Sequence, residues 1–321
     1  MTTTLRPSPR TKPGNRSRPD KGSTPARKRS VRRPRTDLRA ALIFITPAAV
    51  GFIAFFLVPA VLGIGYSFTD YRVFGPVNFV GLDNYAALFQ DPLFWNALGV
   101  TLEYVVINIV VQTVLAVGVA VLMHRLTRSI VVRGIILLPY LVANVVVALV
   151  WFWIFDYSSG IANQVLAFFG VHPVAFFGSD VFAIPTIALV NVWRFMGYTA
   201  LLIFAGLQTI PKEYYEAASL DGATENRMFW GITLPLLRPV LALVLVISVV
   251  GSFQIFDTVA VTTKGGPVNA TRVIYYYIYE LAFEKFKFGY ASAISVVLLV
   301  ILAAISLIQL RILRADKSDL G

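Results

Sequence analysis

The stretch EAASLDGATENRMFWGITLPLLRP, residues 216–239, mixes charge, glycine and proline between two long apolar segments. Good helix formers occupy 212–220 just before and into it. Gly222 predicts the end of that helix, because glycine accepts the left-handed conformation at a helix C-terminus. Thr224 can cap a second helix, and Glu225 suits its first turn. The stretch therefore predicts a rigid helix–turn–helix, with a solvated loop containing incidental helices as the alternative.

The rest of the chain is strongly apolar. Of its 321 residues, 57% are hydrophobic and 14% are charged, and the mean hydropathy is +0.72. Soluble domains carry more charge, and a bilayer core needs about 20 consecutive apolar residues per helix. Six such segments in one chain favour membrane spans over buried core helices and predict an all-α membrane protein. The six segments are 40–68, 97–123, 130–155, 181–207, 234–261 and 288–313.

The net charge of +11 resides in the N-terminal tail, because residues 1–39 hold 13 Lys and Arg against 2 Asp and the remainder is neutral. Such a tail cannot bury a core and is expected to be disordered. Its basic region is too long for a secretory signal, and the apolar run after it spans a bilayer, so we interpret that run as an anchor. We expect the tail to lie in the cytoplasm near anionic lipid, with no nucleic-acid partner.

Lysine and arginine favour cytoplasmic loops. If the tail is inside and six spans alternate, the inside segments are the tail, 124–133, 208–238 and the C-terminal end. They hold 22 of the 28 Lys and Arg, and the outside segments hold 5. This distribution places both termini and the quoted stretch in the cytoplasm.

The quoted stretch resembles the EAA loop in the membrane subunits of binding-protein-dependent ABC importers. The pattern E-A-A-x-x-D-G-A, ending in I-x-L-P-x-L-x-P, is complete here. The similarity continues through 80–98, 137–151, 205–211 and 262–301, and covers most of residues 40–313. It is greatest to the carbohydrate-uptake, maltose-type branch, and within it to the first of two paired permeases.

This resemblance implies a type I ABC importer permease fold in the bacterial cytoplasmic (inner) membrane, with a permease domain over 40–313, a coupling loop over 211–239 and a cytoplasmic C-terminal tail over 314–321. The implied partners are a second homologous permease, two ATP-binding subunits and an extracytoplasmic solute-binding protein. In the family the coupling helix sits in a groove of the ATPase, where Glu216 would make a polar contact and Gly222 the tight turn. The residues that the resemblance implies for coupling to the ATPase are Glu216, Ala217, Ala218, Asp221, Gly222 and Ala223.

The chain contains no G-x-x-x-x-G-K-[ST] stretch, so it cannot cradle ATP by that route and another chain must supply the energy. We expect ATP and Mg²⁺ on the partner ATPase and no cofactor in this chain. There is no cysteine, and the two histidines are far apart, so no metal site is predicted. We therefore do not expect an enzyme.

Polar residues inside spans are costly and usually face the bundle interior. Hydroxyls need hydrogen bonds and sugar C–H faces pack on aromatic rings, and the family binds its sugar from the corresponding three segments. The alternatives are interhelical contacts and, for Arg194 and Asp257, a buried ion pair. The fifth segment lacks an asparagine cluster, which argues against maltose. The predicted substrate path consists of Tyr140, Asn144, Asn191, Arg194, Tyr198, Ser252, Phe253, Gln254 and Asp257.

The leading hypothesis is thus the permease subunit of an ABC importer for a sugar or sugar derivative. A stand-alone secondary transporter would need internal repeats or an ion relay, and a membrane-embedded enzyme would need convergent catalytic groups. The solute stays open among mono-, di- and oligosaccharides, amino sugars and glycerol-phosphate-like molecules.

Overall fold

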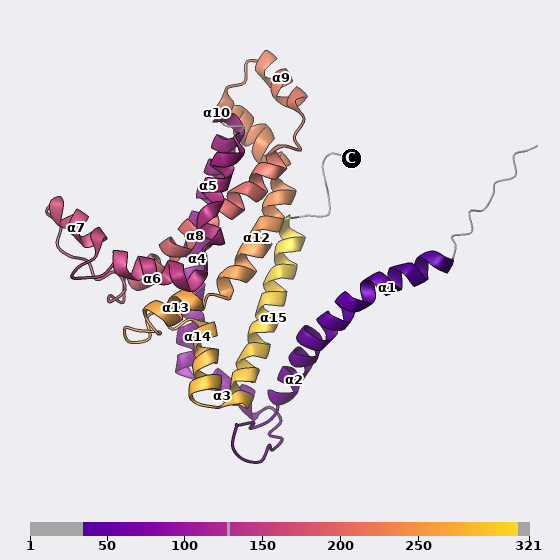
Figure 1. Cartoon of the computed structure of the whole chain (residues 1–321), viewed down its shortest axis with the longest axis vertical. Helices are drawn as coiled ribbons and strands as arrows, with labels where there is room; N and C mark the ends of the chain where they lie inside the picture. The colour runs from indigo at the N-terminus through magenta and orange to yellow at the C-terminus, as the bar shows by residue number, and fades with distance from the viewer. Residues whose placement is uncertain (1–34, 127–128, 314–321) are drawn as a thin grey trace, which may run out of the picture. The chain divides into compact units, whose positions relative to one another are not determined.

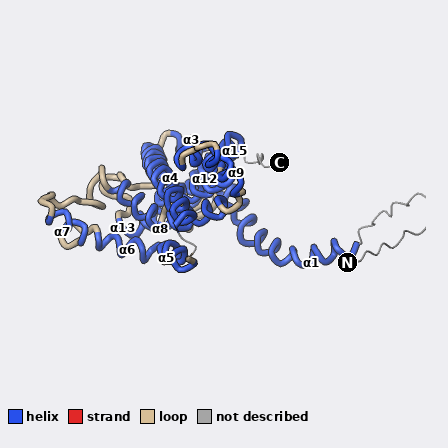
Figure 2. The backbone as a smooth tube through the Cα atoms, turned by 90° about the horizontal axis from the view of Figure 1, so that it is seen from above, coloured by secondary structure: helices blue, strands red, loops and turns tan. Residues whose placement is uncertain are grey.

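The computed structural model describes residues 35–126 and 129–313. Helices make up its secondary structure over this range, apart from one isolated antiparallel bridge between Thr69 and Phe79 (Figure 2). Of the two predicted tails, 1–39 and 314–321, residues 1–34 and 314–321 lie outside the described part, and residues 35–39 are helical. The chain divides into two compact units, Met1–Phe56 and Leu57–Gly321.

The first unit contains α1 (Arg35–Phe52) and most of the π-helical turn η1 (Ile53–Leu57). Its apolar side chains are largely exposed, with Phe44 at 83% and Phe55 at 79%. A helix that is apolar on its exposed faces suits lipid rather than water. Together with α2 (Val58–Tyr66), this stretch supplies an apolar run over Ala41–Tyr66, close to the predicted first span.

The second unit holds four more helices that are long and apolar enough to cross a membrane: α4 (Pro92–Leu126), α8 (Ala183–Leu207), α12 (Arg238–Phe253) with α13 (Asp257–Thr262), and α15 (Phe288–Leu313). Within this unit α4 packs along α8 and α12, and α12 packs along α15 (Figure 1). These helices confirm the predicted second, fourth, fifth and sixth spans to within a few residues.

The third predicted span differs from a continuous helix. Residues 130–155 form α5 (Ile130–Leu141) and α6 (Asn144–Ile154), which are bent by 88° with respect to each other. Val142 and Ala143 between them are extended, with ψ of 139° and 135°. Pro139, inside α5, lacks the amide hydrogen that would bond to the preceding turn, which weakens the helix just before the break.

The fifth predicted span, 234–261, is also interrupted. After the short α11 (Leu234–Leu236), α12 runs to Phe253, and α13 begins only at Asp257. Residues 254–256 between them are not helical. Two of the six predicted spans therefore contain a break.

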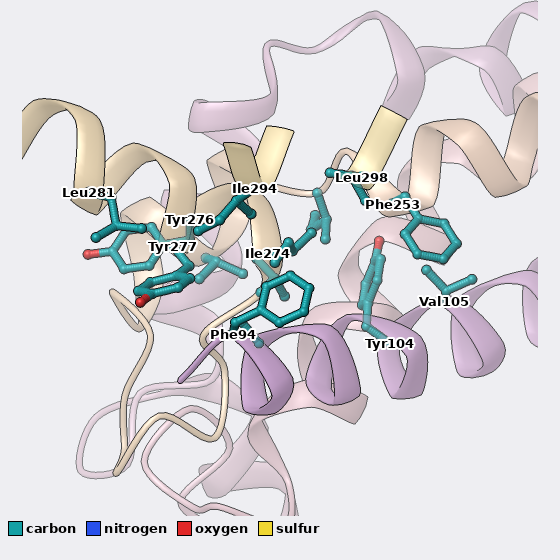
Figure 3. Packing of buried hydrophobic residues seen from close by; sticks show 14 of the residues in the cluster. Phe94, Tyr104, Val105, Phe253, Ile274, Tyr276, Tyr277, Leu281, Ile294 and Leu298 are labelled. Carbon is teal, nitrogen blue, oxygen red and sulfur yellow. The ribbon is translucent and has the colours of Figure 1, made fainter. Parts of the chain in front are cut away.

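The largest core lies where α4, α12, α14 (Ile274–Tyr279) and α15 meet (Figure 3). Phe94 and Tyr104 of α4 pack there with Ile274 and Tyr277 of α14. The aromatic helix α14 is thus part of the core. The π-helical turn η3 (Glu280–Glu284) follows it.

The two ends of the second unit carry the shorter helices. At one end lie α9 (Lys212–Leu220) and α10 (Glu225–Met228), followed by the π-helical turn η2 (Phe229–Thr233); at the other lie α3 (Asp83–Phe89) and α14 (Figure 1). The remaining helix, α7 (Ile161–Phe168), follows α6.

Candidate functional site

The turn between α9 and α10 has the predicted geometry. Gly222 has φ of +74°, in the left-handed region. The amide of Ala223 donates to the carbonyl of Ala218 at 2.9 Å, and the amide of Gly222 donates to Ser219 at 3.1 Å. These two bonds form a Schellman motif, which satisfies carbonyls at the end of α9. The predicted helix end at Asp221-Gly222 is therefore confirmed.

The second helix of this turn is also capped as expected. The side-chain oxygen of Thr224 accepts from the amide of Arg227 at 3.4 Å. Glu225, in the first turn of α10, makes an ion pair with Arg125 at the end of α4. The hydroxyls of Tyr215 and Thr233 lie 2.9 Å apart and join α9 to η2. The cap and the Tyr215–Thr233 bond thus hold the helix–turn–helix together, and the Glu225–Arg125 pair fixes it to α4.

The outer face of α9 is exposed. Leu220 is 89% exposed, and Glu216 is also exposed, whereas Tyr215 is partly buried toward η2. An exposed leucine beside an acidic residue on a rigid helix gives a surface with both apolar and polar character. Of the predicted coupling residues, Glu216, Ala217, Asp221 and Gly222 are exposed, and Ala218 and Ala223 are half-buried.

A cavity of about 350 Å³ lies among α4, α5, α6, α8, α12 and the start of α13. Most of its lining is polar or aromatic. Seven of the nine predicted path residues line it: Tyr140, Asn144, Asn191, Tyr198, Ser252, Gln254 and Asp257. The structure therefore brings together residues that lie more than 110 positions apart in the sequence.

Phe253 and Arg194 do not line this cavity. Phe253 is 1% exposed and packs in the core beside Tyr104 and Val105 (Figure 3). The aromatic side chains on the cavity wall are instead those of Phe195 and Phe256, with the tyrosines. Because α12 ends at Phe253, helical spacing does not predict which side Phe256 faces.

Besides Phe195 and Phe256, five polar or aromatic lining residues were not among the predicted path: Tyr104, Asn108, Gln112, Thr199 and Ser248. Three of them form a buried network with Ser252. Asn108 donates to Ser252 Oγ at 3.0 Å and to Gln112 Oε1 at 3.2 Å, and Gln112 Nε2 donates to Thr199 Oγ1 at 2.8 Å. Their signal in the sequence is the spacing of Tyr104, Asn108 and Gln112, four apart on one face of a span.

The lining residues differ in how much of their hydrogen bonding the protein already uses. Asn191 is 3% exposed and donates to the carbonyl of Ile187 and to Thr258 Oγ1, so it joins α8 to α13. Gln254 is exposed, and its side-chain amide has no hydrogen-bond partner among the described residues, whereas its backbone amide donates to the carbonyl of Gly251 at 3.2 Å. Asn191 and Ser252 thus make interhelical contacts, whereas the side-chain amide of Gln254 is left unpaired on the cavity wall.

Arg194 and Asp257 have separate partners. The guanidinium of Arg194 donates to the carbonyls of Val142 and Tyr140. The carboxylate of Asp257 accepts from Asn144 Nδ2 at 2.8 Å. Among the described residues, the ion pairs do not include Arg194 with Asp257, and no three His, Cys, Asp or Glu side chains are placed to hold a metal.

Comparison with known proteins gives one consistent result. Residues 112–315 match the family model described as "Binding-protein-dependent transport system inner membrane component". The chain is 36% identical to a probable ABC transporter permease protein, YurN, of Bacillus subtilis, over 86% of this chain and 97% of that protein. It is 35% identical to the trehalose/maltose transport system permease protein MalF of Thermococcus litoralis, over 73% and 79%.

A crystal structure of a bacterial alginate ABC transporter, in complex with an alginate pentasaccharide-bound periplasmic protein, contains a chain with the same fold. The two chains superpose with a TM-score of 0.78 over 89% of this chain and 97% of that one, at 24% identity. The family match covers more than half of the chain, and the α9–α10 turn has the geometry that the EAA resemblance implies. This chain belongs to the family of binding-protein-dependent transport system inner membrane components and is a multi-pass ABC importer permease.

Proposed function

We propose that this permease carries an uncharged sugar through the cavity among α4, α5, α6, α8, α12 and the start of α13, driven by ATP hydrolysis on separate subunits. The observation that supports this most directly is the cavity lining, which combines neutral hydrogen-bonding groups with aromatic faces. A sugar that leaves water needs partners for its hydroxyls. Gln254 and Asn144 can supply them, while Phe195 and Phe256 can pack on sugar C–H faces.

The charge of the lining narrows the solute class. Among the described residues that line the cavity, Asp257 is the one carboxylate, and none is a lysine or arginine. The nearby cation, Arg194, is occupied by backbone carbonyls. A uronate, sulfonate or phosphate would therefore enter this half of the path with no cation to replace its hydration. Relatives differ in their named solutes, since one is a trehalose/maltose permease and a structural neighbour is part of an alginate transporter.

The assembly follows from the family. We propose a heterodimer with a second, similar permease, two ATP-binding subunits that hold ATP and Mg²⁺, and an extracytoplasmic solute-binding protein. The exposed face of α9, with Glu216 and Leu220, would dock on the ATPase. The lysine and arginine distribution supports a bacterial inner membrane topology with both termini in the cytoplasm, and with residues 1–39 and 314–321 as cytoplasmic tails.

The test is reconstitution of the complete complex in proteoliposomes with its binding protein. Uptake of radiolabelled maltose, trehalose and raffinose would be compared with uptake of glucuronate and glycerol 3-phosphate. Binding of each solute to the isolated binding protein would be measured in parallel, so that rates are compared only for solutes that are delivered. We expect uptake of a neutral sugar that requires ATP. Equal uptake of a delivered anionic solute would contradict the solute class, and uptake without the ATP-binding subunits would contradict the importer itself.

A further inference from the structure

The break in the third span leaves backbone groups without helical partners. α5 ends at Leu141, and the chain turns by 88° before α6 begins at Asn144. The last four carbonyls of a helix have no intrahelical donors, and lipid cannot provide any. A break within a membrane segment therefore needs donors from another part of the protein.

Arg194 of α8 supplies these donors. Its Nη2 atom donates to the carbonyl of Val142 at 3.2 Å and to that of Tyr140 at 3.5 Å, and its Nε atom donates to Val142 at 3.4 Å. The guanidinium also lies over the ring of Phe195, 4.7 Å from its centroid. A cation at a helix C-terminus is further stabilised by the helix dipole. Arg194 thus caps the end of α5.

The face of α8 that carries Arg194 also contacts α5 at two further positions. Positions 194, 197 and 198 share one helical face. A Cβ atom at Gly197 would lie 2.0 Å from the carbonyl oxygen of Ile136, so the two backbones approach closely there. The ring of Tyr198 stacks on that of Tyr140, with centroids 4.6 Å apart and planes at 15°. α5 is therefore fixed by contact, stacking and capping on one surface.

The other side of the break is fixed to the second interrupted span. Asn144 is the first residue of α6, and its Nδ2 atom donates to Asp257 Oδ2 at 2.8 Å. Asp257 is in turn the first residue of α13, just after the interruption at 254–256. A carboxylate at a helix N-terminus is favourable. The two breaks are thus joined by one hydrogen bond at the wall of the cavity.

We propose that Arg194 is a positioning residue of the transport path: by capping α5 it fixes the bend, so that Tyr140 and Asn144 project into the cavity from opposite sides of the break. Arg194 itself does not line the cavity and acts through these two residues. The assignment of the cavity as the sugar path rests on the proposed function, but the angle between α5 and α6 can be measured without any sugar.

The chain contains no cysteine, so two introduced cysteines give unique spin-label sites within it. Ile135 and Val150 are both exposed, one on each side of the break. With a rise of 1.5 Å per residue, their backbone positions are about 16 Å apart for a right-angled bend and about 22 Å apart for a straight helix. The label distance in the reconstituted full complex therefore reports the bend.

We expect one narrow distance distribution in the parent protein and a broader, longer one after Arg194→Gln. Arg194→Lys keeps the cation but loses the planar fork, and should fall between the two. The matched control is Arg133→Gln, because Arg133 also carries its guanidinium over an aromatic ring, that of Phe204 at 4.3 Å, yet lies on α5 far from the break. This control should retain the parent distribution.

An unchanged distribution in Arg194→Gln, or the same change in Arg133→Gln, would overturn the proposal. A second readout separates positioning from general stability: uptake of whichever panel sugar the parent complex transports, expressed per amount of assembled complex. We expect Arg194→Gln to lower this uptake at least tenfold. Adding Asn144→Ala should lower it little further, because Arg194 acts in part by positioning the Asn144 side chain. A purely additive pair, or a loss that follows complex yield, would also overturn it. If no sugar were transported by the parent complex, the proposed function would fail while the distance result still decided the role of Arg194.

Discussion

Replacing Gly222 with valine should uncouple the permease from ATP hydrolysis while leaving the membrane bundle intact. Gly222 has φ of +74° at the end of α9, and two Schellman hydrogen bonds close around it. Valine disfavours this conformation because its branched Cβ crowds the neighbouring carbonyl. The turn would open, and the exposed face of α9 would lose its fixed orientation.

The size of the effect follows from the surroundings of this glycine. A Cβ atom built at Gly222 meets nothing within 4 Å, so packing adds no further strain. The left-handed conformation costs an L-residue about 1–2 kcal/mol. That energy corresponds to roughly a 5- to 30-fold change in the population of the closed turn. If only the closed turn docks, the apparent affinity for the ATPase should fall by the same factor.

The assay is co-purification of the ATP-binding subunit, together with ATP hydrolysis stimulated by the loaded binding protein. Gly222→Asn is the conservative variant, because asparagine accepts the left-handed conformation, and it should remain close to the parent. Gly170→Val is the matched control: Gly170 has φ of +75°, nothing within 4 Å of its Cβ position, and ends α7 with the same pair of hydrogen bonds. Parent-like docking in Gly222→Val, or an equal loss in Gly170→Val, would refute this reasoning.

Three further outcomes are expected. Gln254→Ala should lower uptake about tenfold at unchanged complex yield, because a buried solute hydroxyl left unpaired costs about 1–3 kcal/mol. Asn191→Ala should instead lower the complex yield, because Asn191 joins α8 to α13. The reverse result would make Asn191 the solute contact and Gln254 the interhelical contact. Gly197→Ala should lower the thermal unfolding midpoint, since its Cβ would lie 2.0 Å from the Ile136 carbonyl oxygen, and an unchanged midpoint would mean that α5 can shift freely. Burial raises the pKa of Asp91, but hydrogen bonds from two tyrosine hydroxyls and backbone amides outweigh it and hold this pKa below its usual value. The stabilisation from Asp91 is therefore complete above that usual value and is lost as the pH falls through the lowered pKa; the unfolding midpoint of Asp91→Asn should approach that of the parent in acid, and a gap that did not change with pH would contradict this.

The sequence predicts the spans well because hydropathy over about 20 residues is a strong local signal. The sixth predicted span, 288–313, coincides with α15, and the fourth differs from α8 by two residues at its start. The end of α9 is equally local, since Asp221-Gly222 places a glycine where the left-handed conformation is needed. Each of these features depends on residues that are close together in the chain.

The breaks in the third and fifth spans are not predictable in this way. Hydropathy is continuous across Val142 and Ala143, and the break there is stabilised by Arg194, some fifty positions later. Pro139 is the one local signal, and proline alone often gives only a kink. The residue that follows the interruption of the fifth span, Asp257, likewise accepts a hydrogen bond from Asn144, which lies in another span.

The predicted path shows how the same limit acts on single residues. The sequence predicts Tyr140, Asn191 and Tyr198 on the path because they are polar groups inside spans, and the structure puts them on the cavity. It also predicts Phe253 there as an aromatic partner for a sugar, yet this side chain is in the core, and Phe256 lines the cavity instead. Helical spacing holds only as far as the helix does, and α12 ends at Phe253.

Broken spans also explain how this bundle accommodates two opposite charges that do not pair with each other. Arg194 lies at the C-terminal end of α5, where unpaired carbonyls make the surroundings negative, and Asp257 lies at the N-terminal end of α13, where free amides make them positive. A continuous helix would offer neither environment, because its backbone groups would be consumed by its own hydrogen bonds. The break therefore makes each charge tolerable inside a span, and each charge in turn supplies or accepts hydrogen bonds that hold the break in place. The cavity lies at the meeting point of the two breaks, so the polar groups that a sugar needs are exposed by the same interruption that anchors the charges beside them.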